Sequence, residues 1–160
     1  MRHTISVVVE NKPGVLSRVA NLFARRGFNI ESLAVGVTEK PEVSRMTIVV
    51  EGDEQVLEQI IKQLYKLIDT LKVYDLPADR SIFRELVLIK VNASEKDRQE
   101  ITQIVDIFRG KIVDVAETSL TVEITGDEGK IQGAEKLLAK FGIRELVRTG
   151  KIALQRGSAE

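Results

Sequence analysis

One order of elements occurs twice along the chain, and this duplication limits the possible folds more than any other feature. In the first copy, residues 3–10 (HTISVVVE) alternate with period two, and residues 52–69 (GDEQVLEQIIKQLYKLID) have helical spacing. Another helix is expected from Pro13 to the stop signal Gly27. The remaining strands are expected at 29–38, 44–51 and 70–76. The order is therefore strand, helix, strand, strand, helix, strand.

The same order returns in the second half of the chain. Helices are expected over 94–110 and 127–142, and strands over 82–91, 111–118, 119–126 and 143–155. Two successive βαββαβ units predict an α+β fold built from two tandem ferredoxin-like units, each an antiparallel sheet with both helices on one face. The expected division is a first domain at 1–76, a linker at 77–81 and a second domain at 82–160.

The sheet face without helices should be polar if water covers it. Several positions out of phase with the helix-facing residues are apolar instead, namely Val8, Val49 and Leu88. A unit of roughly 80 residues also buries only about 60% of its unfolded surface. Both points predict association through sheet faces or edges, and we expect an obligate oligomer.

The charge balance excludes several classes of partner. The 24 Lys and Arg residues equal the 24 Asp and Glu residues in number, and no basic stripe marks a nucleic-acid or anionic-membrane surface. No apolar run approaches the roughly 20 residues of a membrane span. The apolar stretch near the N-terminus is too short for a signal peptide. We expect a cytoplasmic protein with no nucleic-acid partner and no membrane partner.

Residues suited to catalysis are scarce. The chain has no cysteine, and its one histidine, His3, is expected to be a solvated strand residue. Nucleophilic sites of the Cys–His or Ser–His–Asp kind are therefore excluded, as are metal sites built on thiolates or several histidines. No G-x-G-x-x-G motif occurs. We expect a binding protein with no catalytic residues, no metal ligands and no cofactor of its own.

The first helix lacks the negative charge that opens the other three. Those helices begin at Asp53, at Ser94 and at Asp127, the second of them with a capping-box pattern. No acidic residue lies between Glu10 and Glu31. The positive end of the first helix dipole is therefore left without a charge partner from its own sequence.

This helix start, NKPGVL (11–16), is suited to an anion supplied from outside. Backbone N–H groups around Gly14, Val15 and Leu16 would face the anion, and Asn11 offers an acceptor for an ammonium group. A small carboxylate with an apolar side chain fits better than a phosphate, because no Gly-rich phosphate loop is present. Two explanations stay open: a ligand site, or an ordinary helix start in which Gly14 allows close chain packing.

Longer segments resemble a known family. ISVVVENKPGVLSRVANLFARRGFNIESLAVGVTE resembles the opening of the ACT domain in the small, regulatory subunit of acetolactate synthase (acetohydroxyacid synthase). SRMTIVVEGDEQVLEQIIKQLYKLIDTLKVYDL resembles its continuation, and FRELVLIKV with IFRGKIVDV resembles the second domain. The N-x-P-G-V-L element is shared by many ACT domains. Its succession with RGFNIESL, SRMTIVV and RELVLIKV is specific to this family.

The resemblance implies a regulatory role. In that family the large, catalytic subunit carries thiamine diphosphate, Mg²⁺ and FAD. It condenses pyruvate with a second 2-ketoacid at the start of branched-chain amino-acid biosynthesis. The small subunit raises that activity and confers feedback inhibition, typically by valine. The implied partners are the large subunit, a second copy of this chain and a branched-chain amino-acid effector.

The resemblance also implies an effector site where two ACT domains pair edge to edge. The residues carried over by motif are Asn11, Gly14, Val15 and Leu16 of one chain and Asn29 and Ile30 of the other. The helix start would bind the carboxylate, the two asparagine amides would orient the amino acid, and Leu16 and Ile30 would add apolar contact. The alternatives are a turn role for Asn29, a core position for Ile30 and an inward-pointing Leu16.

The second unit departs from this pattern. Its first strand-to-helix connection, VNASEKDRQ (91–99), has neither proline nor glycine and carries its own acids. We expect no amino-acid site there, and a role in dimerisation or partner contact instead. For the whole chain, an amino-acid-sensing ACT regulator of another biosynthetic enzyme is the alternative function.

Overall fold

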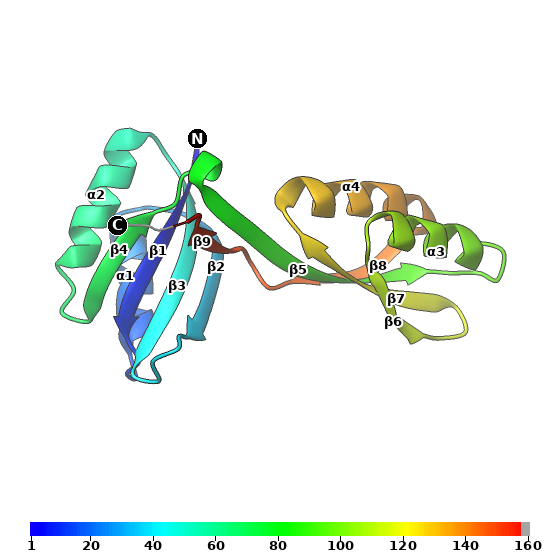
Figure 1. The fold of residues 1–160 in the computed structure, drawn as a ribbon, viewed down its shortest axis with the longest axis horizontal. Helices are drawn as coiled ribbons and strands as arrows, with labels where there is room; N and C mark the ends of the chain where they lie inside the picture. The colour runs from blue at the N-terminus through cyan, green and yellow to red at the C-terminus, as the bar shows by residue number, and fades with distance from the viewer. Residues whose placement is uncertain (158–160) are drawn as a thin grey trace. The chain divides into compact units, whose positions relative to one another are not determined.

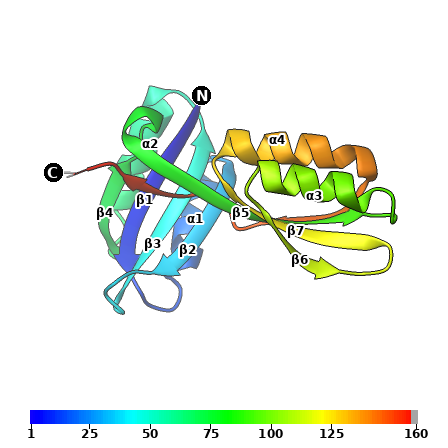
Figure 2. The same cartoon turned by 45° about the vertical axis from the view of Figure 1, so that its right-hand side comes forward.

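The computed structural model describes residues 1–157 (Figure 1). The chain forms two compact units, one of Met1–Ile82 with the segment that begins at Lys151, and one of Phe83–Gly150. Each unit has an antiparallel sheet with two α-helices on one of its faces (Figures 1 and 2). The expected α+β class with tandem ferredoxin-like units is confirmed.

In the first unit the elements follow the expected order. They are β1 (Arg2–Glu10), α1 (Val15–Arg25), β2 (Ile30–Val37), β3 (Val43–Glu51), α2 (Glu54–Tyr65) and β4 (Thr70–Asp75). The strands lie in the order β2-β3-β1-β4, and every neighbouring pair is antiparallel. β2 and β4 are therefore the edges of this sheet.

The core of the first unit lies between its sheet and its helices. Alternate residues of β1, namely Ile5, Val7 and Val9, are buried there with Phe23 of α1 and Leu64 of α2. Their spacing follows the period of two in a strand and of 3.6 in a helix, which places them on one face of each element. Each such side chain contributes about 1.5–3 kcal/mol through burial.

The second unit repeats this arrangement after a short 3₁₀ helix, η1 (Ala78–Arg80). Its elements are β5 (Ser81–Asn92), α3 (Arg98–Ile107), β6 (Lys111–Val115), β7 (Ser119–Gly126), α4 (Glu128–Leu138), η2 (Ala139–Phe141) and β8 (Ile143–Arg148). The sheet order is β6-β7-β5-β8, again antiparallel. Val87 and Ile89 of β5 are buried with Ile101 of α3 and Ile131 of α4.

Two helices begin later than the sequence predicts. α1 begins at Val15 rather than Pro13, and α3 begins at Arg98 rather than 94. The expected capping box of α3 is not formed, because the Ser94 hydroxyl donates to Oδ2 of Asp97 at 2.7 Å instead of capping a backbone N–H. Asp97 itself precedes the helix without a side-chain cap bond.

The segment expected as one strand over 143–155 is two strands. β8 ends at Arg148, and β9 (Ile152–Gln155) begins after Gly150, which has a positive φ of 85°. β8 pairs with β5 inside the second unit, whereas the chain from Lys151 onward belongs to the first unit. The second compact unit thus ends earlier than the expected domain 82–160, whose last three residues lie outside the described residues.

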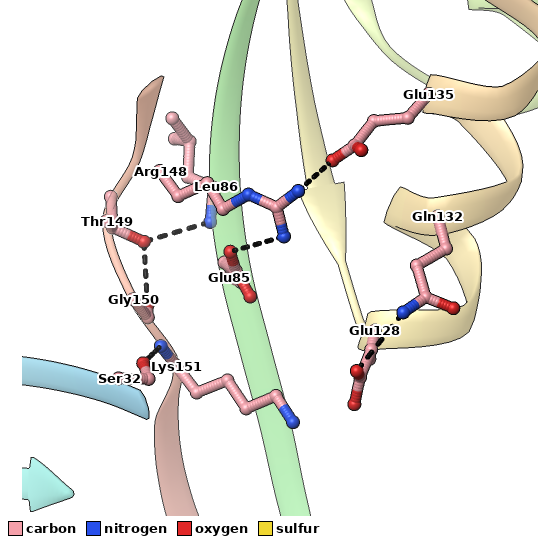
Figure 3. Close-up of polar contacts among 10 residues, drawn as sticks. All are labelled: Ser32, Glu85, Leu86, Glu128, Gln132, Glu135, Arg148, Thr149, Gly150 and Lys151. Atoms are coloured by element: carbon pink, nitrogen blue, oxygen red, sulfur yellow. Dashed lines mark hydrogen bonds and ion pairs between the residues drawn. The ribbon is translucent and has the colours of Figure 1, made fainter. Parts of the chain in front are cut away.

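The outer face of the first sheet is covered by the C-terminal segment of the same chain. Val49 lies opposite Thr4 and Ser32 on this face, and it is only 2% exposed. The backbone N–H of Lys151 donates to the Ser32 hydroxyl at 3.0 Å (Figure 3). Leu154 of β9 lines one cavity with residues of β2 and β3 and another with residues of β3 and β4. Val49, which from the sequence alone indicates association with a second chain, is therefore buried within a single chain.

Candidate functional site

Gly14 lies immediately before α1 with a left-handed backbone, φ 86° and ψ −9°. Residues with a Cβ adopt this conformation at a cost of about 1–2 kcal/mol, and glycine does not. The sequence interpretation placed Gly14 inside the first helical turn, where it would weaken the helix. The structure corrects this, and the backbone conformation alone gives a reason for glycine at this position.

The start of α1 has fewer hydrogen bonds than the starts of α2 and α4. Asp53 and Asp127 each accept a bond of 2.9 Å from a backbone N–H of their helix. Gly14 has no side chain for this, and the first turn of α1 contains no acid. The Val15 N–H reaches only the Lys12 carbonyl, at 3.4 Å. The absence of acidic residues noted in the sequence thus corresponds to a helix start whose backbone N–H groups have no side-chain cap.

Arg18 brings a positive charge to this helix start. Its Nε lies 2.7 Å from Oδ2 of Asp69 in an ion pair whose carboxylate is 8% exposed and whose guanidinium side chain is 47% exposed. A Cβ placed on Gly14 would lie 3.0 Å from Nη1 of Arg18. The guanidinium therefore lies beside Gly14 as a source of N–H donors, with its charge balanced by the Asp69 carboxylate. The sequence interpretation missed Arg18, although a residue four positions after Gly14 lies on the same helix face.

Asn11 is tied to the connection between β2 and β3. Its Nδ2 donates to the Pro41 carbonyl at 2.9 Å, and its backbone N–H donates to the Glu42 carbonyl at 2.8 Å. The amide oxygen accepts no hydrogen bond within residues 1–157. The amide oxygen of Asn11 is therefore available for the acceptor role that the sequence predicts. The amide nitrogen already donates to Pro41.

The other predicted residues occupy two places in the first unit. Val15 is buried in the core, and Leu16 beside it is 45% exposed, so Leu16 does not point inward. Asn29 is exposed just before β2, and Ile30, the first residue of β2, is partly buried against the core. No hydrogen bond joins the helix-start residues to Asn29 or Ile30 in the described part of one chain. Their predicted meeting across two chains stays a prediction.

The single histidine has a structural position. His3 is buried rather than solvated, and its Nε2 lies 3.0 Å from the Gly52 carbonyl, which gives it a structural contact. Residues 1–157 contain no group of three or more His, Asp and Glu side chains placed to hold a metal ion. In the same residues, no helix is both long and apolar enough to cross a membrane.

Family models match both halves of the chain. Residues 5–72 match the model of an AHAS small subunit-like ACT domain. Residues 84–157 match the model of the small subunit of acetolactate synthase. The two matches together cover nearly the whole chain, in the order that the sequence resemblance implies.

Individual relatives of the same family match nearly the whole chain. A protein of Archaeoglobus fulgidus named a probable acetolactate synthase small subunit is 58% identical over 99% of both chains. The acetolactate synthase small subunit of Mycobacterium leprae is 55% identical over 97% of this chain and 92% of its own. The crystal structure of an acetolactate synthase small subunit from Thermotoga maritima has a TM-score of 0.93, with 46% identity over 99% of both chains.

Proposed function

This chain belongs to the family of acetolactate synthase small subunits, and we propose that it activates the large subunit and makes it sensitive to valine. The large subunit is expected to hold thiamine diphosphate, Mg²⁺ and FAD and to carry out the condensation of 2-ketoacids. This chain supplies no catalytic group in the proposal. Its contribution is to bind the large subunit and the amino-acid effector.

The main support for the effector proposal is the uncapped start of α1. This helix has no acid in its first turn and no side-chain cap, and Arg18 places a guanidinium beside Gly14. A free amino acid carries a carboxylate that suits such a positive site. The site lies on the exposed side of α1, where the half-exposed side chain of Leu16 offers apolar contact to an aliphatic effector.

The proposed site is completed by a second chain. Asn29 and Ile30 lie at the beginning of β2, an edge strand whose outer backbone groups pair with no other strand of the described chain. Pairing of such an edge with its copy satisfies those groups and brings Asn29 and Ile30 of the partner chain to the helix start. Feedback control at metabolite concentrations calls for a dissociation constant of about 10–500 µM, or roughly −4.5 to −7 kcal/mol.

The experiment is reconstitution with the cognate large subunit, loaded with thiamine diphosphate, Mg²⁺ and FAD. Acetolactate formation from pyruvate is measured for each subunit alone and for the mixture, with and without valine. We expect no turnover from this chain alone, increased turnover from the mixture, and inhibition of the mixture by valine. Turnover by the isolated chain would overturn the regulatory assignment. Capture of a different biosynthetic enzyme in a pull-down, with no effect on the large subunit, would favour the alternative function.

A further inference from the structure

The residue just before the C-terminal strand β9 contacts β2, the strand that begins at the proposed effector residue Ile30. The Lys151 N–H donates to Oγ of Ser32 in β2 at 3.0 Å, and Ser32 is two residues after Ile30 (Figure 3). This bond joins residues that are 119 positions apart in the sequence. It is therefore a tertiary contact at the beginning of β2, close to the proposed site.

The backbone of β2 is irregular at this point. Its register with β3 shifts between Ile30 and Ser32, so Glu31 is an extra residue in the ladder. An irregularity of this kind bends a strand and sets the direction of the neighbouring side chains. Two contacts hold it from outside the ladder: the Lys151–Ser32 bond on one side and an ion pair of 2.9 Å between Arg2 Nε and Glu31 Oε2. The direction of Ile30 therefore depends on these contacts.

β9 pairs with β5, and the Arg156 N–H just after it donates to the Arg80 carbonyl at 2.7 Å. Ala153 is 6% exposed, whereas Ile152 and Leu154 are 57% and 60% exposed. Thr47 of the first sheet lines a cavity together with Ala153, and Ser6 lies opposite Thr47 in that sheet. The buried hydroxyl of Ser6 has no hydrogen-bond partner within the described residues. A single small apolar side chain over a partly polar surface contributes little through burial. Hydrogen bonds, among them Lys151–Ser32 and those of the pairing with β5, therefore hold β9 more than apolar burial does.

The chain just before Lys151 is attached to the second unit. Arg148 pairs with Glu85 and Glu135, and the Thr149 hydroxyl accepts from the Leu86 N–H at 3.1 Å and donates to the Gly150 carbonyl at 2.8 Å (Figure 3). These contacts fix the chain up to the last residue of that unit. Lys151 is the next residue, and it bonds directly to β2.

We propose that the Lys151–Ser32 contact positions the beginning of β2 for effector binding. Ser32 is a positioning residue in this proposal, acting through Asn29 and Ile30 rather than by touching the effector. The functional part of the inference rests on the proposed valine site. Its structural part, that β9 sets the conformation of residues 29–31, is independent of what the site binds.

The test compares Ser32→Ala with Ser32→Thr, which keeps a hydroxyl and suits a strand. Amide hydrogen exchange followed by NMR reports whether the Lys151 N–H is bonded, and the Asn29 and Ile30 amide shifts report the conformation of β2. We expect slow exchange at Lys151 in the wild type, exchange about tenfold faster in Ser32→Ala, and recovery in Ser32→Thr. The Asn29 and Ile30 shifts should move in Ser32→Ala and return in Ser32→Thr.

The functional readout is the valine concentration that half-inhibits the reconstituted enzyme. It should rise about 2- to 10-fold in Ser32→Ala, the effect of one hydrogen bond, while activation of the large subunit is unchanged. Ser94→Ala removes a serine hydroxyl bond in the second unit and should leave both readouts at wild-type values. Unmoved Asn29 and Ile30 shifts in Ser32→Ala would overturn the inference. If the wild-type enzyme ignores valine, the proposed function fails, and the NMR shifts still decide the positioning role of Ser32.

Discussion

Arg18 and Asp69 form an ion pair of 2.7 Å that joins α1 to the turn between α2 and β4. The Asp69 carboxylate is buried, and its backbone carbonyl also accepts the Glu10 N–H at 3.0 Å. The pair keeps a cation beside Gly14, at the positive end of a helix that has no acid of its own. Because only one partner is buried, the two partners contribute unequally when either is removed.

Arg18→Met should lower the free energy of unfolding by about 1–3 kcal/mol, because Asp69 is left buried without its partner. Asp69→Asn should cost less, since the half-exposed guanidinium of Arg18 can be solvated by water. Urea unfolding followed by circular dichroism measures both changes. Equal losses in the two variants would contradict the unequal roles of the partners.

Substitution of Gly14 tests the effector site. Gly14→Glu places a carboxylate where the carboxylate of valine is proposed to bind, so the reconstituted enzyme should still be activated but should lose valine inhibition. A typical coupling of about 1–3 kcal/mol corresponds to a shift of roughly 5- to 150-fold in the inhibitory concentration. The positive φ of Gly14 adds a backbone cost of about 1–2 kcal/mol. The helix dipole alone suggests little change in stability, and the structure therefore revises that expectation.

Gly14→Ala is the matched control for this experiment. It has the same backbone cost as Gly14→Glu but adds no charge, and its Cβ is accommodated by a small movement of the flexible end of Arg18. Its loss of valine response should therefore be clearly smaller than that of Gly14→Glu. Normal valine inhibition in Gly14→Glu would place the site elsewhere.

The helix caps of the second unit give a further prediction. Asp127→Ala should destabilise the protein by about 1 kcal/mol, because its side chain accepts from the Lys130 N–H at 2.9 Å. Asp97→Ala should change stability by less than about 0.5 kcal/mol, since Asp97 caps no backbone N–H of α3. Thermal unfolding of the two variants measures the difference. A cost for Asp97→Ala as large as that for Asp127→Ala would mean that α3 is capped in solution.

The oligomeric state is the fourth prediction. Sedimentation velocity should show a dimer or larger species, with valine favouring one arrangement, because the proposed site takes residues from two chains. The position of β9 on the outer sheet face does not block the expected dimer, because pairing through the edge strand β2 does not use that face. A stable monomer that binds valine with full affinity would exclude a shared site.

The fold was predictable because its signals are local. The alternation of Ile5, Val7 and Val9 and the helical spacing in α1 are visible within short windows, and each copy of the pattern supports the other. The left-handed conformation of Gly14 was harder to predict from the sequence. A Pro-Gly pair suits glycine either inside the first turn or before it, and the choice depends on how the loop after Asn11 is held to Glu42.

Contacts between distant segments account for the rest. Arg18 finds Asp69 51 residues away, and no short pattern indicates that pairing. Residues 143–155 resemble one strand because both parts contain β-branched and other apolar residues. The break at Gly150 follows from a partner, Ser32, that lies far earlier in the chain. The two-chain part of the site depends on an interface that a single chain does not contain.

The position of β9 has a consequence for synthesis on the ribosome. The four strands of the first sheet lie within the first 75 residues, whereas Ala153, which helps to cover their outer face, is translated only after the second unit. The nascent first unit therefore carries an uncovered sheet face throughout translation of the second, at the stage when chains are most prone to aggregate. The hydroxyl side chains of Ser6 and Thr47 lie opposite each other in the first sheet, and such polar groups reduce the tendency of an uncovered sheet face to bind other nascent chains.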